Sequence, residues 1–347
     1  MDASTKIQIR KVFETRVLKV MKTGDLPDGF DLLAREIFLY QMRECPAVAA
    51  YARVRLGPAP PRTWKEIPAL PLEAFKLSTV RTFPESETVA TFHTSGTTGE
   101  KRGQHAFATL DLYAASVVEG WRHASLPKLP MILLLPTPMQ MPESSLAAMF
   151  DILGRELSLV QRAIWEPGHR VPPEALHTAR EALGSGPVLI AGTALALLHL
   201  LERDAKHQPL PEGSWVLETG GYKSSGRDLP KESLYALITK KFGVPPERII
   251  NEYGMTEISS QFYARGLDQP HQGPPWMRAT VIDPRTGQEA PIGGLGVLRI
   301  VDLANVGSAI AIETRDLAVR AEEGFFLVGR DPSALPRGCS RLMENAR

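Results

Sequence analysis

The stretch FHTSGTTGEKRG, residues 92–103, gathers hydroxyls and glycines in one short run and closes with two cations, Lys101 and Arg102. Sequence of this kind has a low propensity for helix and for strand, so the stretch predicts a loop. The backbone N–H groups and hydroxyls of such a loop can turn toward one anion, and the cations suit the same ligand. The apolar segment VATF, residues 89–92, predicts a short strand that leads into the loop.

The loop differs from the phosphate loop of P-loop NTPases, because it lacks their Gly-Lys followed by Ser or Thr. A run of Gly, Ser and Thr is also common in surface loops that bind nothing. The rest of the chain therefore decides between a phosphate site and an ordinary loop.

The composition is that of an ordinary globular protein. The chain has 347 residues, 43% of them hydrophobic, and a formal net charge of +1. That length can bury one large core or two medium ones. No block of basic residues indicates a nucleic-acid partner, and the longest apolar runs are too short or too polar at their flanks to span a bilayer.

The two cysteines, Cys45 and Cys339, lie far apart and form no CxxC pair. They indicate neither a disulfide framework nor a structural zinc site, and we expect a reducing, cytoplasmic location. The N-terminal residues contain no apolar core of a signal peptide, which agrees with that expectation.

Strands and helices alternate through the middle of the chain. Apolar segments at residues 130–136, 187–192, 214–221 and 248–254 predict strands, and segments with helical periodicity separate them. Thr109 and Ser144 are candidate N-caps, Gly243 is a helix stop, and another helical pattern runs from about Phe30 to Leu56. The alternation predicts an α/β fold, whereas the chain from Trp276 onward has the pattern of β-hairpins.

Three polar loops each follow a predicted strand. They are HTSGTTG, TGGY at residues 219–222 and EYGMTE at residues 252–257. Ligands of α/β sheets bind beyond the carboxyl ends of the strands, so we expect the three loops to converge on one cleft.

The EYGMTE loop carries residue types that suit a nucleotide. Tyr253 offers an aromatic face to a base, and Gly254 lets the backbone come close. Thr256 offers a hydroxyl to a phosphate, and Glu257 offers a hard oxygen to Mg²⁺. Taken alone, the loop favours another interpretation, a strand-to-helix turn that has Glu257 on a solvated face.

Two charged residues near the end of the chain can each be interpreted either as a nucleotide contact or as a structural residue. Asp316, within IETRDLA, can accept hydrogen bonds from both hydroxyls of a ribose, or it can be a turn residue. Arg330, within GRD, can reach a phosphate or ribose, or it can form a surface ion pair that contributes little.

In this order the motifs resemble a known family. TSGTTG, TGGY, YGMTE, TRDLA and GRD are similar to the core motifs of the adenylate-forming superfamily of acyl-CoA ligases, adenylation domains and luciferases. IPALPLEAFK, NEYGMTEISSQFY, PPWMRA, DLANVGS and LPRGCSRLME look like one branch of it, the LuxE-type acyl-protein synthetases. The resemblance runs from about Phe38 to Glu344.

The resemblance implies a role for each matching residue. The β- and γ-phosphates of ATP would be held by Thr94, Ser95, Gly96, Thr97, Thr98 and Gly99, and the adenine would lie against Gly220, Gly221 and Tyr222. Thr256 would contact the α-phosphate, Glu257 would bind Mg²⁺, and Asp316 and Arg330 would hold the ribose or phosphate. Lys101 and Arg102 stand where the family has Pro and Lys, so either could be the phosphate-binding cation.

The resemblance also implies the fold and the domain organisation. We expect the large N-terminal domain of the superfamily, with mixed sheets flanked by helices, and without the usual small C-terminal domain, since the sequence stops at Arg347. Residues 1–275 would form the acid- and ATP-binding α/β core, residues 276–331 a β-rich closing segment, and residues 332–347 a tail that carries Cys339.

The implied reaction activates a carboxylic acid with ATP to an acyl-adenylate and then moves the acyl group to a thiol. In LuxE-type enzymes the acceptor is a cysteine in a Gly-Cys-Ser setting like that of Cys339, where Arg337 and Arg341 would favour the thiolate. Without the family, Cys339 would be interpreted as a small buried hydrophobe, as Cys45 is.

Two alternatives remain. One is a ligase whose partner supplies the C-terminal domain or the thiol, as CoA or an acyl carrier protein; the other is an inactive nucleotide-binding subunit that docks an acyl-reductase or acyl-transferase. The acid itself could be fatty, branched or aryl.

Overall fold

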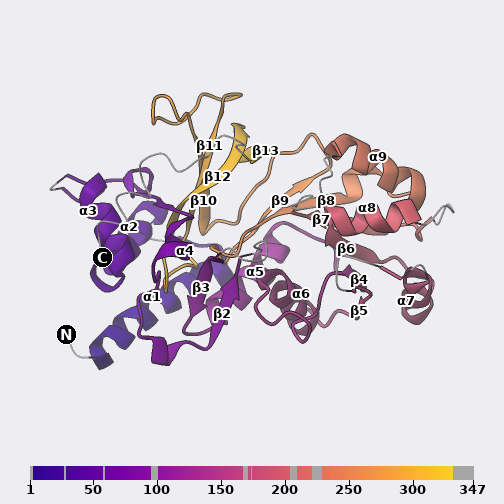
Figure 1. Ribbon diagram of the computed structural model, residues 1–347, viewed down its shortest axis with the longest axis horizontal. Helices are drawn as coiled ribbons and strands as arrows, with labels where there is room; N and C mark the ends of the chain where they lie inside the picture. The colour runs from indigo at the N-terminus through magenta and orange to yellow at the C-terminus, as the bar shows by residue number, and fades with distance from the viewer. Residues whose placement is uncertain are drawn as a thin grey trace. The chain divides into compact units, whose positions relative to one another are not determined.

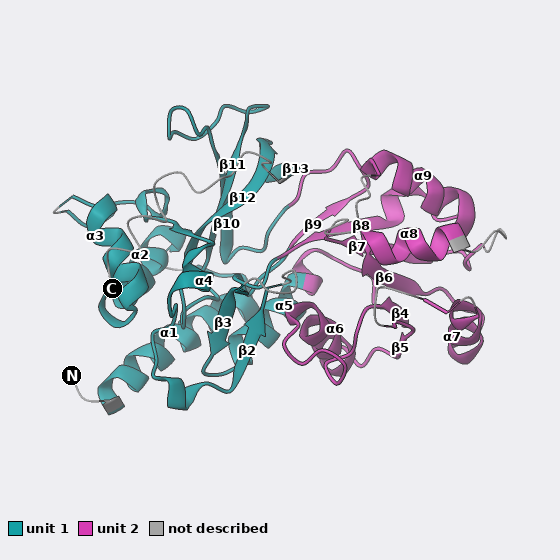
Figure 2. Cartoon of the chain, viewed as in Figure 1, with its two compact units in different colours: residues 1–120, 255–261, 272–347 teal, residues 121–254, 262–271 magenta. Residues whose placement is uncertain are grey.

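The computed structural model describes residues 3–26, 29–57, 59–94, 101–166, 171–172, 174–203, 209–220 and 229–330. Contacts between residues divide the chain into two compact units (Figure 2). Unit 1 comprises residues 1–120, 255–261 and 272–347, and unit 2 comprises residues 121–254 and 262–271. The functional boundaries at residues 275 and 331 stay a prediction.

Unit 2 is built on a six-stranded sheet in the order β5-β4-β6-β7-β8-β9 (Figure 1). Its strands are β4 (Met131–Leu134), β5 (Gln161–Ala163), β6 (Leu189–Thr193), β7 (Trp215–Thr219), β8 (Ile249–Tyr253) and β9 (Phe262–Arg265). The first five are mutually parallel and β9 is antiparallel to β8. The helices are α6 (Ser145–Glu156), α7 (Ala175–Leu183), α8 (Ala194–Arg203) and α9 (Lys231–Phe242), and a 3₁₀ turn, η3 (Pro246–Arg248), precedes β8.

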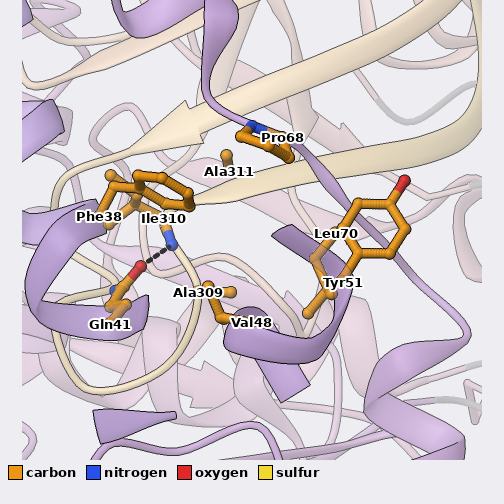
Figure 3. A pocket seen from close by; sticks show the side chains of 9 residues that line it. All are labelled: Phe38, Gln41, Val48, Tyr51, Pro68, Leu70, Ala309, Ile310 and Ala311. Carbon is orange, nitrogen blue, oxygen red and sulfur yellow. Dashed lines mark hydrogen bonds between the residues drawn. The ribbon is translucent and has the colours of Figure 1, made fainter. Parts of the chain in front are cut away.

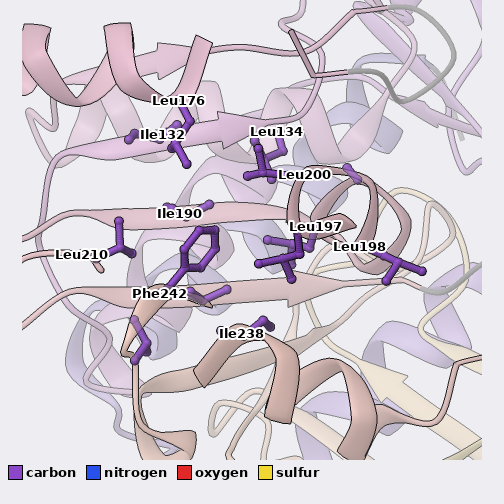
Figure 4. Packing of buried hydrophobic residues seen from close by; sticks show 14 of the residues in the cluster. Ile132, Leu134, Leu176, Ile190, Leu197, Leu198, Leu200, Leu210, Ile238 and Phe242 are labelled. Carbon is purple, nitrogen blue, oxygen red and sulfur yellow. The ribbon is translucent and has the colours of Figure 1, made fainter. Parts of the chain in front are cut away.

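The core of unit 2 forms where this sheet packs against its helices (Figure 4). Ile132 of β4 and Ile190 of β6 lie in one buried cluster with Leu197 of α8 and Ile238 of α9. All four residues of β4 are buried, as expected for a parallel strand covered on both faces. The apolar runs of the sequence therefore became the central strands.

The ends of two helices follow from local chemistry. Ser144 Oγ accepts a hydrogen bond from the Ala147 N–H at 3.2 Å, so the predicted N-cap of α6 is confirmed. Gly243 ends α9 with a φ of 70°, a left-handed conformation that glycine adopts without strain.

Unit 1 contains a five-stranded sheet and a separate two-stranded hairpin. The sheet joins β1 (Leu70–Pro71), β12 (Ala311–Arg320), β11 (Leu295–Asp302) and β10 (Met277–Ile282) in that order, and β13 (Phe325–Arg330) pairs with β12. β10 to β13 are antiparallel to their neighbours, whereas β1 runs parallel to β12. The hairpin consists of β2 (Ala90–His93) and β3 (Gln104–Phe107).

The helices of unit 1 lie mainly in the first part of the chain. They are α1 (Ala3–Thr23), α2 (Gly29–Glu44), α3 (Pro46–Arg55) and α4 (Ala74–Leu77), with α5 (Asp111–His123) leading into unit 2 and 3₁₀ turns η1 (Trp64–Glu66) and η2 (Glu85–Glu87). The helical pattern predicted from about Phe30 to Leu56 is confirmed, but it forms two helices, α2 and α3. Cys45 is extended and Pro46 opens a new helix, because proline has no N–H to continue the preceding one.

The predicted α/β class is confirmed, with mixed sheets and flanking helices. Within the described residues, no helix combines the length and the apolar character that crossing a membrane requires.

Candidate nucleotide site

The predicted phosphate loop joins the two strands of the β2–β3 hairpin in unit 1. His93 and Gln104 are register partners at its end. The Thr94 N–H donates to the Gly103 carbonyl at 2.9 Å, and the Gly103 N–H donates to Thr94 Oγ1 at 2.9 Å. Thr94 therefore closes the stem of the hairpin with both its backbone and its hydroxyl.

The two cations after the loop have different environments. Arg102 donates from Nε to the Thr94 carbonyl at 2.6 Å and from Nη2 to the His93 carbonyl at 3.4 Å. Its guanidinium is thus bound to the hairpin stem. Lys101 is exposed.

Glu257 lies beside this stem. A Cβ added to Gly103 would meet Thr94 Cγ2 at 3.0 Å and Glu257 Oε1 at 3.5 Å. The Glu257 side chain is buried, with 5% of the residue exposed. The glycine at position 103 therefore leaves room for a hydroxyl and a carboxylate at the base of the predicted phosphate loop.

The Thr256–Glu257 segment is held at several points within unit 1. Thr256 Oγ1 donates to the His93 carbonyl at 3.4 Å, which connects the segment to β2. The Glu257 carbonyl accepts from Asn305 Nδ2 at 2.8 Å, and the same nitrogen donates to the Ala309 carbonyl at 3.0 Å.

A buried aspartate holds the residues that follow Glu257. Asp302 Oδ2 accepts from the N–H groups of Ser259 and Ser260, both at 2.9 Å, and Oδ1 accepts from Ser260 Oγ at 2.9 Å. Ser260 Oγ in turn accepts from Trp276 Nε1 at 2.9 Å. Burial raises the pKa of Asp302, and these donors oppose that shift. The DLANVGS and PPWMRA motifs thus contact the ISS residues that follow Glu257.

His105 of β3 contacts the Thr256–Glu257 segment as well, through the Thr256 carbonyl. Its Nδ1 lies 2.8 Å from the Thr256 carbonyl and its Nε2 lies 2.8 Å from Ser308 Oγ. The ring is fully buried, and burial lowers its pKa to about 4, so the imidazole is neutral at physiological pH.

No sequence pattern had indicated a role for His105, Gly103 or Asn305. One signal could have indicated His105: β3 alternates between exposed and buried positions, which places the histidine on the inner face with Phe107. The roles of Gly103 and Asn305 depend on residues far away in the chain, and no local pattern reveals them.

Asp316 and Arg330, predicted separately as ribose or phosphate contacts, are register partners on β12 and β13. Asp316 is 9% exposed, and its N–H donates to Thr314 Oγ1 at 3.0 Å. The structure brings the two backbone positions together across one strand pair.

In unit 2, the predicted adenine-binding residues follow neighbouring parallel strands. Gly220 ends β7 with a φ of 65°, a conformation that a side chain would strain, and Tyr253 ends β8. The Tyr253 ring is buried beside Phe262 and His271, each with ring centroids 6.2 Å away. Gly254, the next residue, is exposed.

A buried hydrogen bond joins the ends of these two strands. Thr219 Oγ1 donates to Glu252 Oε2. Burial, together with the nearby charge of Glu218, raises the pKa of Glu252 to about 7, and the Thr219 hydrogen bond opposes the shift. Glu252 therefore titrates near physiological pH, directly beside Tyr253.

A network of polar side chains joins Glu218 of β7 to Asn251 of β8, and through Asn251 to Lys231 and His271. Asn251 Nδ2 donates to Glu218 Oε1, while Asn251 Oδ1 lies 2.8 Å from Lys231 Nζ and 2.6 Å from His271 Nε2. Lys231 Nζ is 3.6 Å from Glu218 Oε1, which offsets part of the rise that burial causes in the pKa of Glu218. The network connects α9 to the strand that carries Tyr253.

Several predicted residues lie outside the described part of the chain: Ser95, Gly96, Thr97, Thr98, Gly99, Gly221, Tyr222 and Cys339. Convergence of the three loops on one cleft stays a prediction. Cys45 is fully buried, and burial raises the pKa of its thiol, as expected of a structural cysteine.

The single carboxylate of Glu257 fits a magnesium ion that is bound together with phosphates. Such an ion takes one or two carboxylates and completes its shell with phosphate oxygens and water. Glu257 supplies a carboxylate next to the hairpin stem. Among the described residues there is no cluster of three or more His, Cys, Asp and Glu that could hold a metal ion.

A small cavity in unit 1 lies apart from these residues, between α2, α3 and β12 (Figure 3). Its volume of about 10 Å³ has room for at most one water molecule, so it cannot hold a substrate. On its wall, Gln41 Oε1 accepts from the Ile310 N–H at 3.0 Å, and Gln41 Nε2 donates to the Asn305 carbonyl at 2.8 Å. Gln41 therefore fixes the loop that carries Asn305.

The chain has relatives in both sequence and structure, although no protein-family model matches it. Over 143 residues it is 27% identical to the long-chain-fatty-acid–luciferin-component ligase of Vibrio harveyi, a match that covers 38% of this chain and 37% of that protein. The chain thus matches little more than a third of the length of this relative.

Two solved enzyme structures share the fold of this chain. A 2-hydroxyisobutyryl-CoA ligase, in an open conformation with 2-HIB-AMP and CoA, superposes with a TM-score of 0.66 at 14% identity, over 88% of this chain and 74% of that one. A luciferase-like enzyme from the mealworm Zophobas morio superposes with a TM-score of 0.50 at 14% identity, over 72% and 59% of the two chains. The chain has the fold of the adenylate-forming enzymes, and the resemblance to the LuxE-type acyl-protein synthetases that its motifs predict is confirmed.

Proposed function

We propose that the protein activates a carboxylic acid with ATP and transfers the resulting acyl group to a thiol, that of Cys339. The observation that carries the proposal is the position of Glu257 Oε1, 3.5 Å from the Cβ position of Gly103. A carboxylate and the hydroxyl of Thr94 meet there, and each suits a part of a magnesium-bound triphosphate.

In the first step, a carboxylate oxygen of the acid attacks the α-phosphorus of ATP. The bond from the α-phosphorus to the bridging oxygen breaks, pyrophosphate leaves, and an acyl-adenylate remains. No proton has to be removed from the carboxylate, so the step needs positioning and charge stabilisation rather than a general base. Thr94 and the loop after it would hold the outer phosphates, and the Thr256 hydroxyl would contact the α-phosphate.

Mg²⁺, held by Glu257, would neutralise charge on the phosphate oxygens. Lys101 is the better candidate for the phosphate-binding cation, because the Arg102 guanidinium is already bound to the carbonyls of Thr94 and His93. The ribose would be held by Asp316 and Arg330, and the adenine by the segments around Gly220 and Tyr253.

In the second step, the Cys339 thiolate would attack the acyl carbonyl, AMP would leave, and a thioester would form. A fatty acid is our first candidate for the substrate, since the Vibrio harveyi relative is named for a long-chain fatty acid. A short hydroxy acid is the second, since the ligase with the same fold is named for 2-hydroxyisobutyrate.

A CoA ligase is the alternative, favoured by the CoA bound in the structure of that ligase. In that case the acyl group would go from the adenylate to CoA or to a carrier protein, and Cys339 would stay unmodified. An inactive nucleotide-binding subunit of an acyl-transfer complex is the remaining alternative.

The test is ATP–pyrophosphate exchange with fatty, branched, aryl and short hydroxy acids, with Glu257→Gln as the matched inactive control. We expect exchange that depends on one class of acid. Intact mass after incubation with that acid and ATP then distinguishes acylated protein from acyl-CoA. Absence of exchange with every acid would favour the inactive subunit.

A further inference from the structure

We propose that His105 is a positioning residue that holds Thr256 and Glu257 against the phosphate hairpin through a single tautomer of its ring, with the proton on Nδ1. The inference rests on the proposed function. His105 lies on β3, the strand that follows the predicted phosphate loop. Its ring contacts the backbone of Thr256, so the proposed role is positioning rather than contact with the substrate.

The tautomer follows from the partners of the ring. The Thr256 carbonyl oxygen, 2.8 Å from Nδ1, can only accept a hydrogen bond, so Nδ1 must carry the proton. In a neutral ring Nε2 is then an acceptor, and Ser308 Oγ at 2.8 Å must donate to it. Both ring nitrogens are satisfied in this arrangement and in no other neutral one.

The environment keeps the ring in that state. His105 is 1% exposed and packs between Phe75 and Phe107, with ring centroids 5.7 and 4.2 Å away. Burial disfavours the charged imidazolium, which would also turn Nε2 into a donor toward Ser308.

His105 and Thr256 connect the β2–β3 hairpin to the Thr256–Glu257 segment. Thr94 and Gly103 close the hairpin at one end of β3, and His105 lies two residues after Gly103. Its bond to the Thr256 carbonyl and the bond of Thr256 Oγ1 to the His93 carbonyl join the Thr256–Glu257 segment to both strands of the hairpin. Loss of the ring donor would release the segment from β3 while leaving the fold of the hairpin intact.

Two amide substitutions separate this role from a purely structural one. In His105→Asn the amide nitrogen is bonded to Cγ, as Nδ1 is, so it can still donate to the Thr256 carbonyl. In His105→Gln the amide lies nearer the position of Nε2 and can still pair with Ser308. Both variants replace the ring by a small buried amide, so both lose comparable packing.

We expect kcat for ATP–pyrophosphate exchange to fall by about tenfold or more in H105Q and by less than about threefold in H105N, since small displacements of a catalytic group lower rates strongly. Calorimetric affinity for MgATP should follow the same order, and the KM of the acid should stay unchanged. Ser308→Ala should lower Tm and leave kcat near that of the wild type, because the bond to Thr256 remains.

A ring measurement tests the tautomer without substrate. Two-bond ¹⁵N–¹H spectra of the labelled wild type, with the ring of His105 assigned through its own backbone resonances, should show His105 neutral with the proton on Nδ1. A proton on Nε2 overturns the inference even if the variants do not fold. Equal losses of kcat and MgATP affinity in H105N and H105Q, with equal Tm, also overturn it.

The outcomes also distinguish this inference from the proposed function. If the wild type binds MgATP but exchanges with no acid, the proposed function fails, and the order of the MgATP affinities still decides the role of His105. If exchange is present and the two amide variants behave alike, the function stands and the positioning role is wrong.

Discussion

Glu257 Oε1 lies 3.5 Å from the position that a Cβ would take on Gly103, and Thr94 Cγ2 lies 3.0 Å from that same position. A glycine at the stem of a hairpin is thus the point where a carboxylate distant in the sequence and Thr94 meet. The contact forms within unit 1, which takes residues 255–261 from between two stretches of unit 2.

Gly103→Ala is expected to lower adenylation without unfolding the protein. The added methyl group would be closer to Thr94 Cγ2 than ordinary van der Waals contact allows, and it would face the Glu257 carboxylate. We expect exchange activity to fall by about tenfold or more, since small displacements of catalytic groups are costly. Gly57→Ala is the matched control, because a Cβ there meets nothing within 4 Å. Equal activity in the two variants would show that the stem tolerates the methyl group.

Glu257→Gln is expected to fold normally and to lose adenylation, because it removes a ligand charge for Mg²⁺ while it preserves the side-chain volume. The measurement is exchange as a function of Mg²⁺ concentration, together with Tm. Glu85→Gln, at a largely exposed position, is the control, and it should behave like the wild type. Exchange at the wild-type rate in Glu257→Gln would remove Glu257 from the site.

Asp316→Ala is expected to raise the KM for ATP and to leave the KM for the acid unchanged. Two ribose hydrogen bonds are worth ~1–3 kcal/mol together, which is roughly a five- to 150-fold change. Steady-state kinetics with each substrate varied in turn check this. A change confined to the acid would contradict the ribose assignment.

Glu252→Gln is expected to make the protein more stable above pH 7 and to have little effect near pH 4.5. The folded state raises the pKa of Glu252 from 4.5 to about 7, so the folded protein retains a proton that the unfolded chain has lost. The wild type therefore loses stability as pH rises through this window, by about 1.4 kcal/mol for each unit. Glutamine resembles the protonated form and cannot ionise, so the variant does not lose stability as pH rises through this window.

Denaturant unfolding of both proteins across that pH range measures the difference. Glu247→Gln, an exposed position in the same unit, is the control and should show no pH-dependent difference. A gap between wild type and Glu252→Gln that stays constant with pH would mean that folding does not raise the pKa of Glu252.

Cys339→Ser is expected to retain exchange and to lose the hydroxylamine-labile acyl label. The adenylate forms without the thiol, whereas a serine hydroxyl is far less nucleophilic than a thiolate and would yield an ester. Exchange and radiolabelled acyl transfer are measured on the same variant. Label that persists, or that maps to Cys45, would favour the alternative in which a partner supplies the thiol.

The sequence by itself determined the features that depend on neighbouring residues. The apolar run at Met131–Leu134 predicted a buried strand, and Ser144 and Gly243 predicted the ends of two helices. These signals are local, because strand burial, capping and left-handed turns act within a few residues. The order of the motifs predicted the fold of the adenylate-forming enzymes, since each motif is one loop with its own residue types.

The tertiary structure alone decided which distant residues of the described chain meet. Glu257 reaches Gly103, and His105 contacts Thr256 and Ser308, through packing between segments that are far apart in the chain. Asp316 and Arg330 are register partners only because β12 and β13 pair in one register, with an irregularity after Leu317. No short window of sequence contains such a pairing, because it is set by the sum of many distant contacts.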